Sequence, residues 1–237
     1  AVFFHHQTNR IGMNKDAEGT RRLELVQSGS IGLTSGIEAT PEPLYGSPTP
    51  RLHSRLRDDL PTLGQELIDF SNSIGKPLLP WQEWLAIEAH RIKPDGRWLH
   101  PLVQLVVARQ QGKTTFMKQR ILMGLFEWDN KLQIGTAHRL TTSLETFRDL
   151  VQTIESNDGL AKQVKRIRWA HGSEEIETLH GTRYMVKAGA SAARGISKPE
   201  TVHIDETREL KDESTWASMR YTMMAAENPQ LWTYSNQ

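Results

Sequence analysis

The chain lacks cysteine and long hydrophobic runs, and both absences narrow its functions. No Cys occurs among the 237 residues, which excludes disulfide bonds, iron–sulfur clusters, thiolate zinc sites and a cysteine nucleophile. Every apolar run is far shorter than the roughly 18 residues that predict a membrane span, so we expect no membrane partner. The net charge is only +1, which demands no nucleic acid but leaves room for a local basic channel.

Residues 1–60 differ from the rest of the chain. They contain several glycines and prolines and show little hydrophobic periodicity, so we expect an extended N-terminal arm or linker that is poorly ordered or binds a partner. Regular structure is expected to begin near Thr62, which forms the pattern of a helical capping box with Gln65. A second helix is expected to start at Pro80 and to continue through Ile92.

From residue 101 onward, short apolar runs alternate with segments of helical periodicity. This alternation predicts an α/β domain over residues 61–237, in which a mainly parallel β-sheet is flanked by helices. Strands are expected at 101–108, 132–137, 164–169, 175–179, 183–187, 201–204 and 231–235. Helices are expected at 116–126, 140–154 and 212–226.

The strongest chemical signal lies between the strand at 101–108 and the helix that follows it. Gly112, Lys113 and Thr114 have the residue types of a phosphate-binding loop. Backbone N–H groups at the helix start would point at the phosphates, the lysine would reach the outer phosphates, and the threonine hydroxyl would ligate Mg²⁺. The first glycine of the usual pattern is missing, because Val107 stands at that spacing. The alternative is a solvated helix start with a surface lysine.

A pair of carboxylates, Asp205 and Glu206, ends another short apolar strand. Ligands of open α/β sheets bind outside the carboxyl ends of the strands, so this pair is well placed to meet the phosphate loop. We expect Asp205 to hold the hydration shell of Mg²⁺ and Glu206 to orient or deprotonate an attacking water. The alternative is an exposed acidic pair that opens a turn.

Four segments together resemble the large terminase subunits of tailed double-stranded DNA bacteriophages. The first looks like a glutamine segment that recognises adenine, and the second like that family's deviant phosphate loop, which lacks the first glycine and carries an arginine. The third looks like the strand with the metal ligand and catalytic glutamate, and the fourth like the motif that couples hydrolysis to movement. In order, the segments are 79–84, 107–114, 202–206 and 233–236, and residues 193–197 also fit the family.

The resemblance implies a P-loop NTPase fold of the ASCE or RecA-like type. It implies an ATP hydrolase, with ATP and Mg²⁺ as ligands, that drives double-stranded DNA into a procapsid. The implied partners are double-stranded DNA, the portal protein, the small terminase subunit and further copies of the chain in a ring. The implied location is the host cell cytoplasm, transiently at the portal vertex of the procapsid. A nuclease domain follows in the family, but this chain ends at Gln237 directly after the coupling segment, so we expect no nuclease domain and no cleavage.

The resemblance also implies roles for single residues. The implied catalytic residues are Lys113, Arg109, Arg194 and Glu206. Either arginine would stabilise transition-state charge, and in the family the arginine at the position of Arg109 acts within its own subunit or across a ring interface. The implied nucleotide-binding residues are Gln82, Arg109, Gln110, Gln111, Gly112, Lys113, Thr114 and Thr115. The implied metal ligands are Thr114 and Asp205, and the implied coupling residues are Ser235 and Asn236.

Structural alternatives to these roles stay open at this point. Arg109 would alternatively be a surface cation or part of a structural ion pair, and Arg194 a cation in a mobile loop. Gln82 would be an exposed glutamine on an amphipathic helix. Ser235 and Asn236 would be polar residues at the end of a strand.

Other residues that often carry chemistry are expected to be structural. The seven tryptophans fall mostly within apolar stripes or strands, so we expect core positions rather than platforms for stacking on nucleic acid. His203 alternates within a strand and is expected to be packed. The clearest basic cluster could contact a DNA backbone, although a solvated face is the more usual interpretation. It consists of Lys162, Lys165, Arg166 and Arg168.

Two alternative functions stay open. A DNA or RNA helicase shares a glutamine segment, a phosphate loop and an Asp-Glu strand, but usually has more glycine in the loop and needs a second motor domain. A nucleotide-binding assembly module would dock on a shell or portal without turnover, and the presence of Glu206 argues against it.

Overall fold

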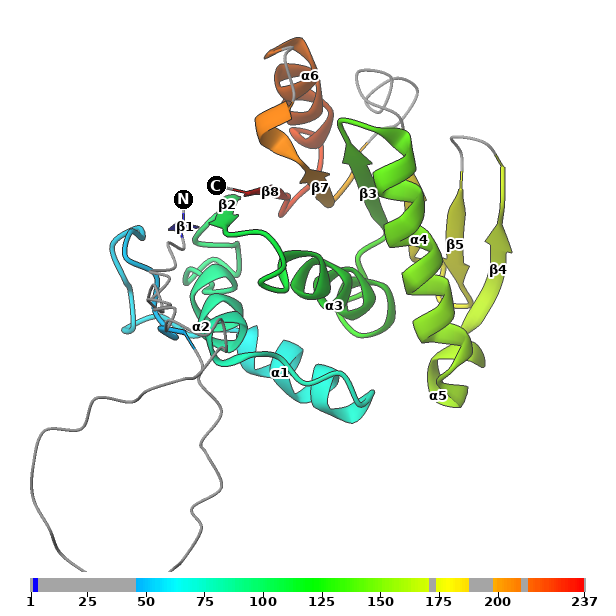
Figure 1. The fold of residues 1–237 in the computed structure, drawn as a ribbon, viewed down its shortest axis with the longest axis horizontal. Coiled ribbons are helices and arrows are strands. Elements are labelled where there is room, and N and C mark those ends of the chain that lie inside the picture. The colour runs from blue at the N-terminus through cyan, green and yellow to red at the C-terminus, as the bar shows by residue number, and fades with distance from the viewer. Residues whose placement is uncertain (1, 4–45, 171–173, 188–197, 210–212, 237) are drawn as a thin grey trace, which may run out of the picture.

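The computed structural model describes residues 2–3, 46–170, 174–187, 198–209 and 213–236. Within these ranges, eight strands form one sheet in the order β1-β2-β8-β7-β3-β6-β5-β4 (Figure 1). Neighbouring strands run parallel except at one edge, where β5 is antiparallel to both β4 and β6. The strands are β1 Val2–Phe3, β2 Leu102–Val107, β3 Leu132–Ala137, β4 Val164–Arg168, β5 Glu175–Thr178, β6 Arg183–Val186, β7 Thr201–Asp205 and β8 Gln230–Asn236.

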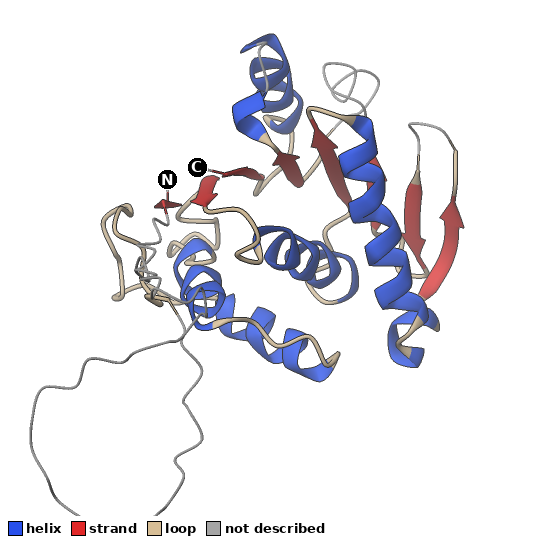
Figure 2. Cartoon of the chain, in the orientation of Figure 1, coloured by secondary structure: helices blue, strands red, loops and turns tan. Residues whose placement is uncertain are grey.

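Helices pack against the sheet from both sides (Figure 2). On one side lie α1 to α5, and the apolar stripe of α4 contacts β3 and β6. On the other side, α6 packs on the middle of the sheet. The helices are α1 Gly64–Ser73, α2 Pro80–Ala89, α3 Lys113–Phe126, α4 Leu140–Glu155, α5 Asp158–Ala161, the 3₁₀ turn η2 Thr207–Glu209 and α6 Glu213–Met223.

Two apolar layers explain why the central strands are nearly continuous apolar runs. In β7, Val202 and Ile204 face α6 and pack with Met219 and Met223. The alternate residues of β7 face the other helices, and His203 among them is fully buried. A strand that is covered on both faces has no solvent side on which polar residues would alternate. The α/β architecture with a mainly parallel sheet, expected from the sequence, is therefore confirmed.

The ends of the first two helices differ from the expectation. The capping box of Thr62 and Gln65 is wrong: the Thr62 hydroxyl accepts from the Gly64 N–H at 2.9 Å, whereas the Gln65 side chain donates to Asp69. The Thr62 hydroxyl also donates to the carbonyl of Ile87 at 2.6 Å, so it ties α1 to α2. The second helix starts at Pro80 as expected but ends at Ala89.

Ile92 was expected inside that helix, and this expectation is wrong. It instead forms an isolated antiparallel bridge with Trp98. The carbonyl of Pro61 accepts from the Ile92 N–H at 2.9 Å, and such pairing with a distant segment replaces the helical ladder.

Only parts of the predicted N-terminal arm fall within the described residues. Val2 and Phe3 add strand β1 to the edge of the sheet, parallel to β2. Residues 46–60 lie beside α2, where the His53 ring contacts Trp84 edge-on at 5.7 Å between centroids. Residues 4–45 lie outside the described residues. In the part of the chain that the structure describes, no helix has the length and apolarity to cross a membrane.

A fully buried arginine, Arg120, joins α3 to the amino ends of β7 and β8. Its guanidinium donates to Asn130, Thr201 and Gln230 at 3.2 to 3.4 Å. Thr201 also donates to Asn130, and Trp232 donates to Gln230, so these acceptors have further hydrogen-bond partners. Burial lowers the pKa of Arg120 to about 10.

The tryptophans behave as core residues only in part. Trp98 and Trp232 are buried, and the Trp128 ring lies 4.7 Å from the Arg120 guanidinium carbon. Trp169 is an exception, because it is 55% exposed and meets Phe147 edge-on. The expectation of core positions is therefore wrong for Trp169.

Candidate functional site

A cleft of about 470 Å³ opens at the carboxyl ends of β2, β7 and β8. Parallel strands present their carboxyl ends at one edge of the sheet, and connecting loops gather there. The residues that line the cleft are Arg109, Gln110, Gly112, Lys113, Thr114, Thr115, Thr142, Asp205, Glu206 and Asn236. The phosphate loop and the acidic pair, expected from the sequence to meet, do so in this cleft.

The loop between β2 and α3 has the backbone of an anion cradle. Gly112 caps α3 with a φ of 89°, and Gln110 also has a positive φ of 62°. The left-handed region is easily reached by glycine, whereas a non-glycine residue there marks a locally constrained turn. The N–H groups of the first turn of a helix have no intrahelical acceptor, so they can bind an anion at this end of α3.

Lys113 forms a buried ion pair across the cleft. Its ammonium lies 2.6 Å from Asp205 Oδ1, and the two side chains are only 10% and 8% exposed. The surface-lysine alternative is therefore wrong, and so is the exposed-acid alternative for Asp205. In this arrangement the positive charge expected to meet a phosphate is neutralised by the carboxylate expected to help hold a metal.

Glu206 begins the turn after β7 and is held at two points. Its backbone N–H donates to Asp205 Oδ1 at 2.8 Å, and its φ of 53° is left-handed. Its side-chain Oε2 accepts a hydrogen bond from Thr142 Oγ1 at 3.3 Å. Glu206 therefore lines the same cleft as Lys113.

Gln82 lies behind the phosphate loop and is 1% exposed. Its Oε1 accepts from the Leu79 N–H at 2.7 Å, and its Nε2 donates to the Gly112 carbonyl at 2.8 Å. The alternative of an exposed helical glutamine is wrong. Both ends of the amide are engaged within the chain, and Gln82 does not line the cleft.

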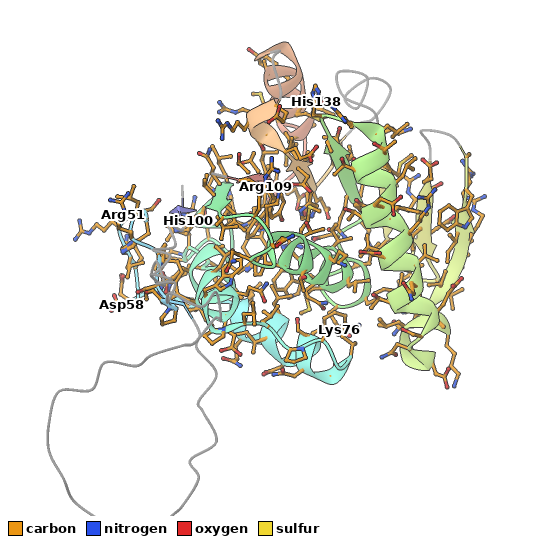
Figure 3. All side chains as sticks on the ribbon, in the orientation of Figure 1. Arg51, Asp58, Lys76, His100, Arg109 and His138 are labelled. Carbon is orange, nitrogen blue, oxygen red and sulfur yellow. The ribbon has the colours of Figure 1, made fainter. Side chains whose placement is uncertain are left out.

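The remaining candidates either line the cleft, lie near it without lining it, or fall outside the described residues. Arg109, which is labelled in Figure 3, follows β2 and lines the cleft. Asn236 also lines it, whereas Ser235 is buried and donates to the Asn236 carbonyl at 3.2 Å. Gln111 lies in the loop but not on the cleft wall. Arg194 lies outside the described residues.

Thr142, in the first turn of α4, is a cleft residue that the sequence did not indicate. A threonine near a helix start is common, and nothing local marks it. Its position follows from the sheet order, because β3 lies beside β7 and thereby brings the start of α4 next to Glu206.

The oxygen donors in the cleft fit a magnesium ion. Mg²⁺ prefers hard oxygen ligands and is commonly bound by one or two carboxylates, water and substrate phosphates. Asp205 supplies a carboxylate and Thr114 a hydroxyl in the same cleft. Asp205 Oδ1 is engaged by Lys113 and by the Glu206 N–H, so a metal at that oxygen requires Lys113 to move.

His203 and the basic cluster have structural surroundings. His203 is fully buried beside Tyr234, 3.0 Å from its hydroxyl, and burial lowers the His203 pKa well below its usual value. In the cluster, Lys165 and Arg166 pair with Glu177 at 2.8 and 2.9 Å. These ion pairs leave less unpaired positive charge on β4 than the sequence alone suggests.

Comparison with solved structures finds phage large terminases. The HK97 bacteriophage large terminase aligns with a TM-score of 0.60 at 22% identity, over 74% of this chain and 38% of that chain. The chain has the fold of this terminase. The ATPase domain of the Thermus phage P74-26 large terminase aligns with a TM-score of 0.47 at 12% identity, over 68% of this chain and 70% of that chain.

The predicted resemblance to large terminases is thus confirmed at the level of the fold. The chain spans 38% of the length of the HK97 terminase chain. No sequence family and no curated protein sequence matches the chain.

Proposed function

We propose that the chain is the ATPase motor domain of a phage large terminase, which hydrolyses ATP to drive double-stranded DNA into a procapsid. The observation that carries the proposal is the cleft in which Lys113 meets Asp205 and Glu206. A phosphate-binding lysine and a nearby carboxylate pair are the groups that phosphoanhydride hydrolysis requires. The terminase fold supports the assignment of this chemistry to a packaging motor.

In the proposed reaction, water attacks the γ-phosphorus of ATP. A new P–O bond forms, the bond between the γ-phosphorus and the β–γ bridging oxygen breaks, and ADP and phosphate leave. Glu206 orients the water and accepts its proton, while Lys113 leaves Asp205 and offsets negative charge on the phosphate oxygens. Thr114 and Asp205 would hold Mg²⁺, which neutralises charge on the β- and γ-phosphates when it is bound.

Arg109 is proposed as the arginine that stabilises the transition state from within the chain, because it lines the cleft. Such an arginine contributes roughly 10³- to 10⁵-fold to the rate in known systems. Gln110, Gln111 and Thr115 complete the proposed nucleotide loop, and Gln82 is proposed to recognise adenine once its present bonds rearrange. Asn236, with Ser235 behind it, is proposed to couple hydrolysis to movement.

The proposed partners follow from the motor assignment. They are double-stranded DNA, a portal protein, a small terminase subunit and further copies of this chain in a ring, at the portal vertex in the host cytoplasm. A helicase would share the same cleft, and separation of a forked duplex by the protein would favour that alternative. An inert assembly module would bind ATP without releasing phosphate at any concentration, even with partner subunits.

The decisive experiment uses Glu206→Gln. This variant is expected to bind ATP with unchanged affinity and to lose phosphate release by at least about 100-fold, because general-base catalysis typically contributes 10²- to 10⁴-fold. Glu209→Gln is the matched control, since Glu209 is an exposed carboxylate three residues later that does not line the cleft. Normal ATP hydrolysis by the Glu206→Gln variant would overturn the catalytic assignment of Glu206. Weakened ATP binding by this variant would instead assign Glu206 a role in nucleotide binding.

A further inference from the structure

Thr142 is the only cleft-lining residue of the described chain that belongs to neither the phosphate loop nor the strands β7 and β8 with their ends. It lies in the first turn of α4, where its backbone N–H donates to the Arg139 carbonyl at 3.1 Å. Its hydroxyl points to the Glu206 carboxylate, with Oγ1 3.3 Å from Oε2. This contact joins two segments that are far apart in sequence.

We propose that Thr142 is a positioning residue that orients the Glu206 carboxylate toward the attacking water. The inference rests on the proposed function, since it assigns a role in the same hydrolytic step. A hydrogen bond from Thr142 to Oε2 leaves Oε1 as the oxygen that faces the reactants and takes the proton from water.

The need for such a partner follows from the way Glu206 is attached. Its backbone is fixed by the left-handed φ of 53° and by the N–H bond to Asp205 Oδ1. Its side chain still has rotatable bonds beyond the backbone, and an unheld carboxylate would occupy several rotamers. Thr142 supplies a contact beyond the backbone, from a helix that is itself packed against the sheet.

The start of α4 adds a favourable field to this contact. A helix of 16 residues presents partial positive charge at its N-terminus, which favours a carboxylate there. Independently of Thr142, the backbone of Glu206 is connected to Lys113 through Asp205, because Asp205 Oδ1 accepts from both the Lys113 ammonium and the Glu206 N–H. Movement of Lys113 onto a phosphate would therefore alter one support of Glu206 while Thr142 keeps the other.

The test compares four variants in steady-state ATP hydrolysis. Thr142→Val removes the hydroxyl and keeps the shape, and it is expected to lower kcat about 10-fold with KM for ATP unchanged, because a small misplacement of a catalytic group is enough for losses of that size. Thr142→Ser keeps the hydroxyl and is expected to stay within about twofold of the unmodified chain. Thr141→Val is the control, since Thr141 is the exposed neighbour that does not line the cleft. Thr142→Val in the Glu206→Gln background is expected to cause no further loss.

The outcomes separate this inference from the proposed function. If the unmodified chain hydrolyses ATP and Thr142→Val matches it, or if Thr142→Ser is as impaired as Thr142→Val, the positioning role is overturned while the ATPase stands. A loss in the Glu206→Gln background as large as in the parent chain also overturns it, because Thr142 would then act independently of Glu206. An unmodified chain without any ATP hydrolysis, alone or with partner subunits, overturns the proposed function and this inference with it.

Discussion

Replacing Lys113 by methionine is expected to destabilise the nucleotide-free protein as well as to abolish ATP binding. Methionine keeps an unbranched apolar stem but removes the ammonium that pairs with Asp205 at 2.6 Å. Among the described residues, the Asp205 carboxylate, with its side chain 8% exposed, would then keep the Glu206 N–H as its one donor. A carboxylate buried without its counter-charge is the origin of the expected instability.

The magnitude lies between two known limits. Removing one partner of a fully buried ion pair destabilises a protein by about 3 to 5 kcal/mol, whereas an exposed pair contributes about 0 to 1 kcal/mol. Lys113 and Asp205 are nearly buried but border an open cleft, through which water can reach the abandoned carboxylate. We therefore expect the free energy of unfolding to fall by about 2 kcal/mol in Lys113→Met. Adding Asp205→Asn, which removes the unpaired charge, is expected to restore at least about 1 kcal/mol of that loss.

The assay is equilibrium unfolding in urea without nucleotide, followed by tryptophan fluorescence and circular dichroism. Lys118→Met is the matched control, because Lys118 lies on the same helix and pairs with Asp149 at 2.8 Å, where the aspartate is half exposed. It is expected to change the free energy of unfolding by less than about 1 kcal/mol. The reasoning is refuted if Lys113→Met loses no more stability than Lys118→Met, or if Asp205→Asn makes the Lys113→Met variant less stable.

Three further predictions concern the loop, the buried arginine and the buried histidines. Gly112→Ala would place a Cβ 2.7 Å from Gln82 Nε2 at a φ of 89°, so it is expected to lower stability by about 1 to 3 kcal/mol and to weaken ATP binding, both measurable by urea unfolding and nucleotide titration. Arg120→Met is expected to change stability by less than about 2 kcal/mol in the same assay, because it removes a buried charge that has no carboxylate partner among the described ion pairs; a loss above about 3 kcal/mol would contradict this. His90 and His203 have pKa values well below the usual one because of burial, so the unfolded chain takes up protons first and stability falls as pH drops below about 6.5. His203→Gln is expected to reduce that slope by about 1 kcal/mol per pH unit, and an unchanged slope would contradict the assignment.

Much of the fold could be predicted because its strands are short apolar runs bounded by turns. The strand expected at 132–137 is found at Leu132–Ala137, and that expected at 201–204 gains only Asp205. A strand buried on both faces leaves a local signature, and so does a helix with one apolar stripe. Ile92 escaped prediction because its apolar side chain fits the helical period, while its backbone pairs with Trp98 and Pro61, which helical periodicity does not reveal.

The candidate site could be predicted where chemistry and strand ends coincide. Lys113 follows one strand, Asp205 ends another, and parallel strands bring their carboxyl ends together, so the meeting of these residues follows from general topology. Thr142 also follows a strand, but its residue type is unremarkable at a helix start, and its contact with Glu206 depends on β3 being the neighbour of β7. That order is a property of the whole sheet.

The side-chain amide of Gln82 joins the start of α2 to the loop that precedes α3. Its amide bonds at once to Leu79 and to the Gly112 carbonyl, and Gly112 is the residue that caps α3 below Lys113. If Gln82 recognises adenine with both ends of its amide, as proposed, these two bonds must be exchanged for bonds to the base. The release of Gly112 would then accompany adenine binding, so the conformation of the phosphate loop and the identity of the base would be coupled through one side chain. A base that cannot hydrogen-bond to both ends of the Gln82 amide would leave Gln82 bonded to the Gly112 carbonyl. The phosphate loop would then bind a nucleotide that carries this base more weakly than it binds ATP.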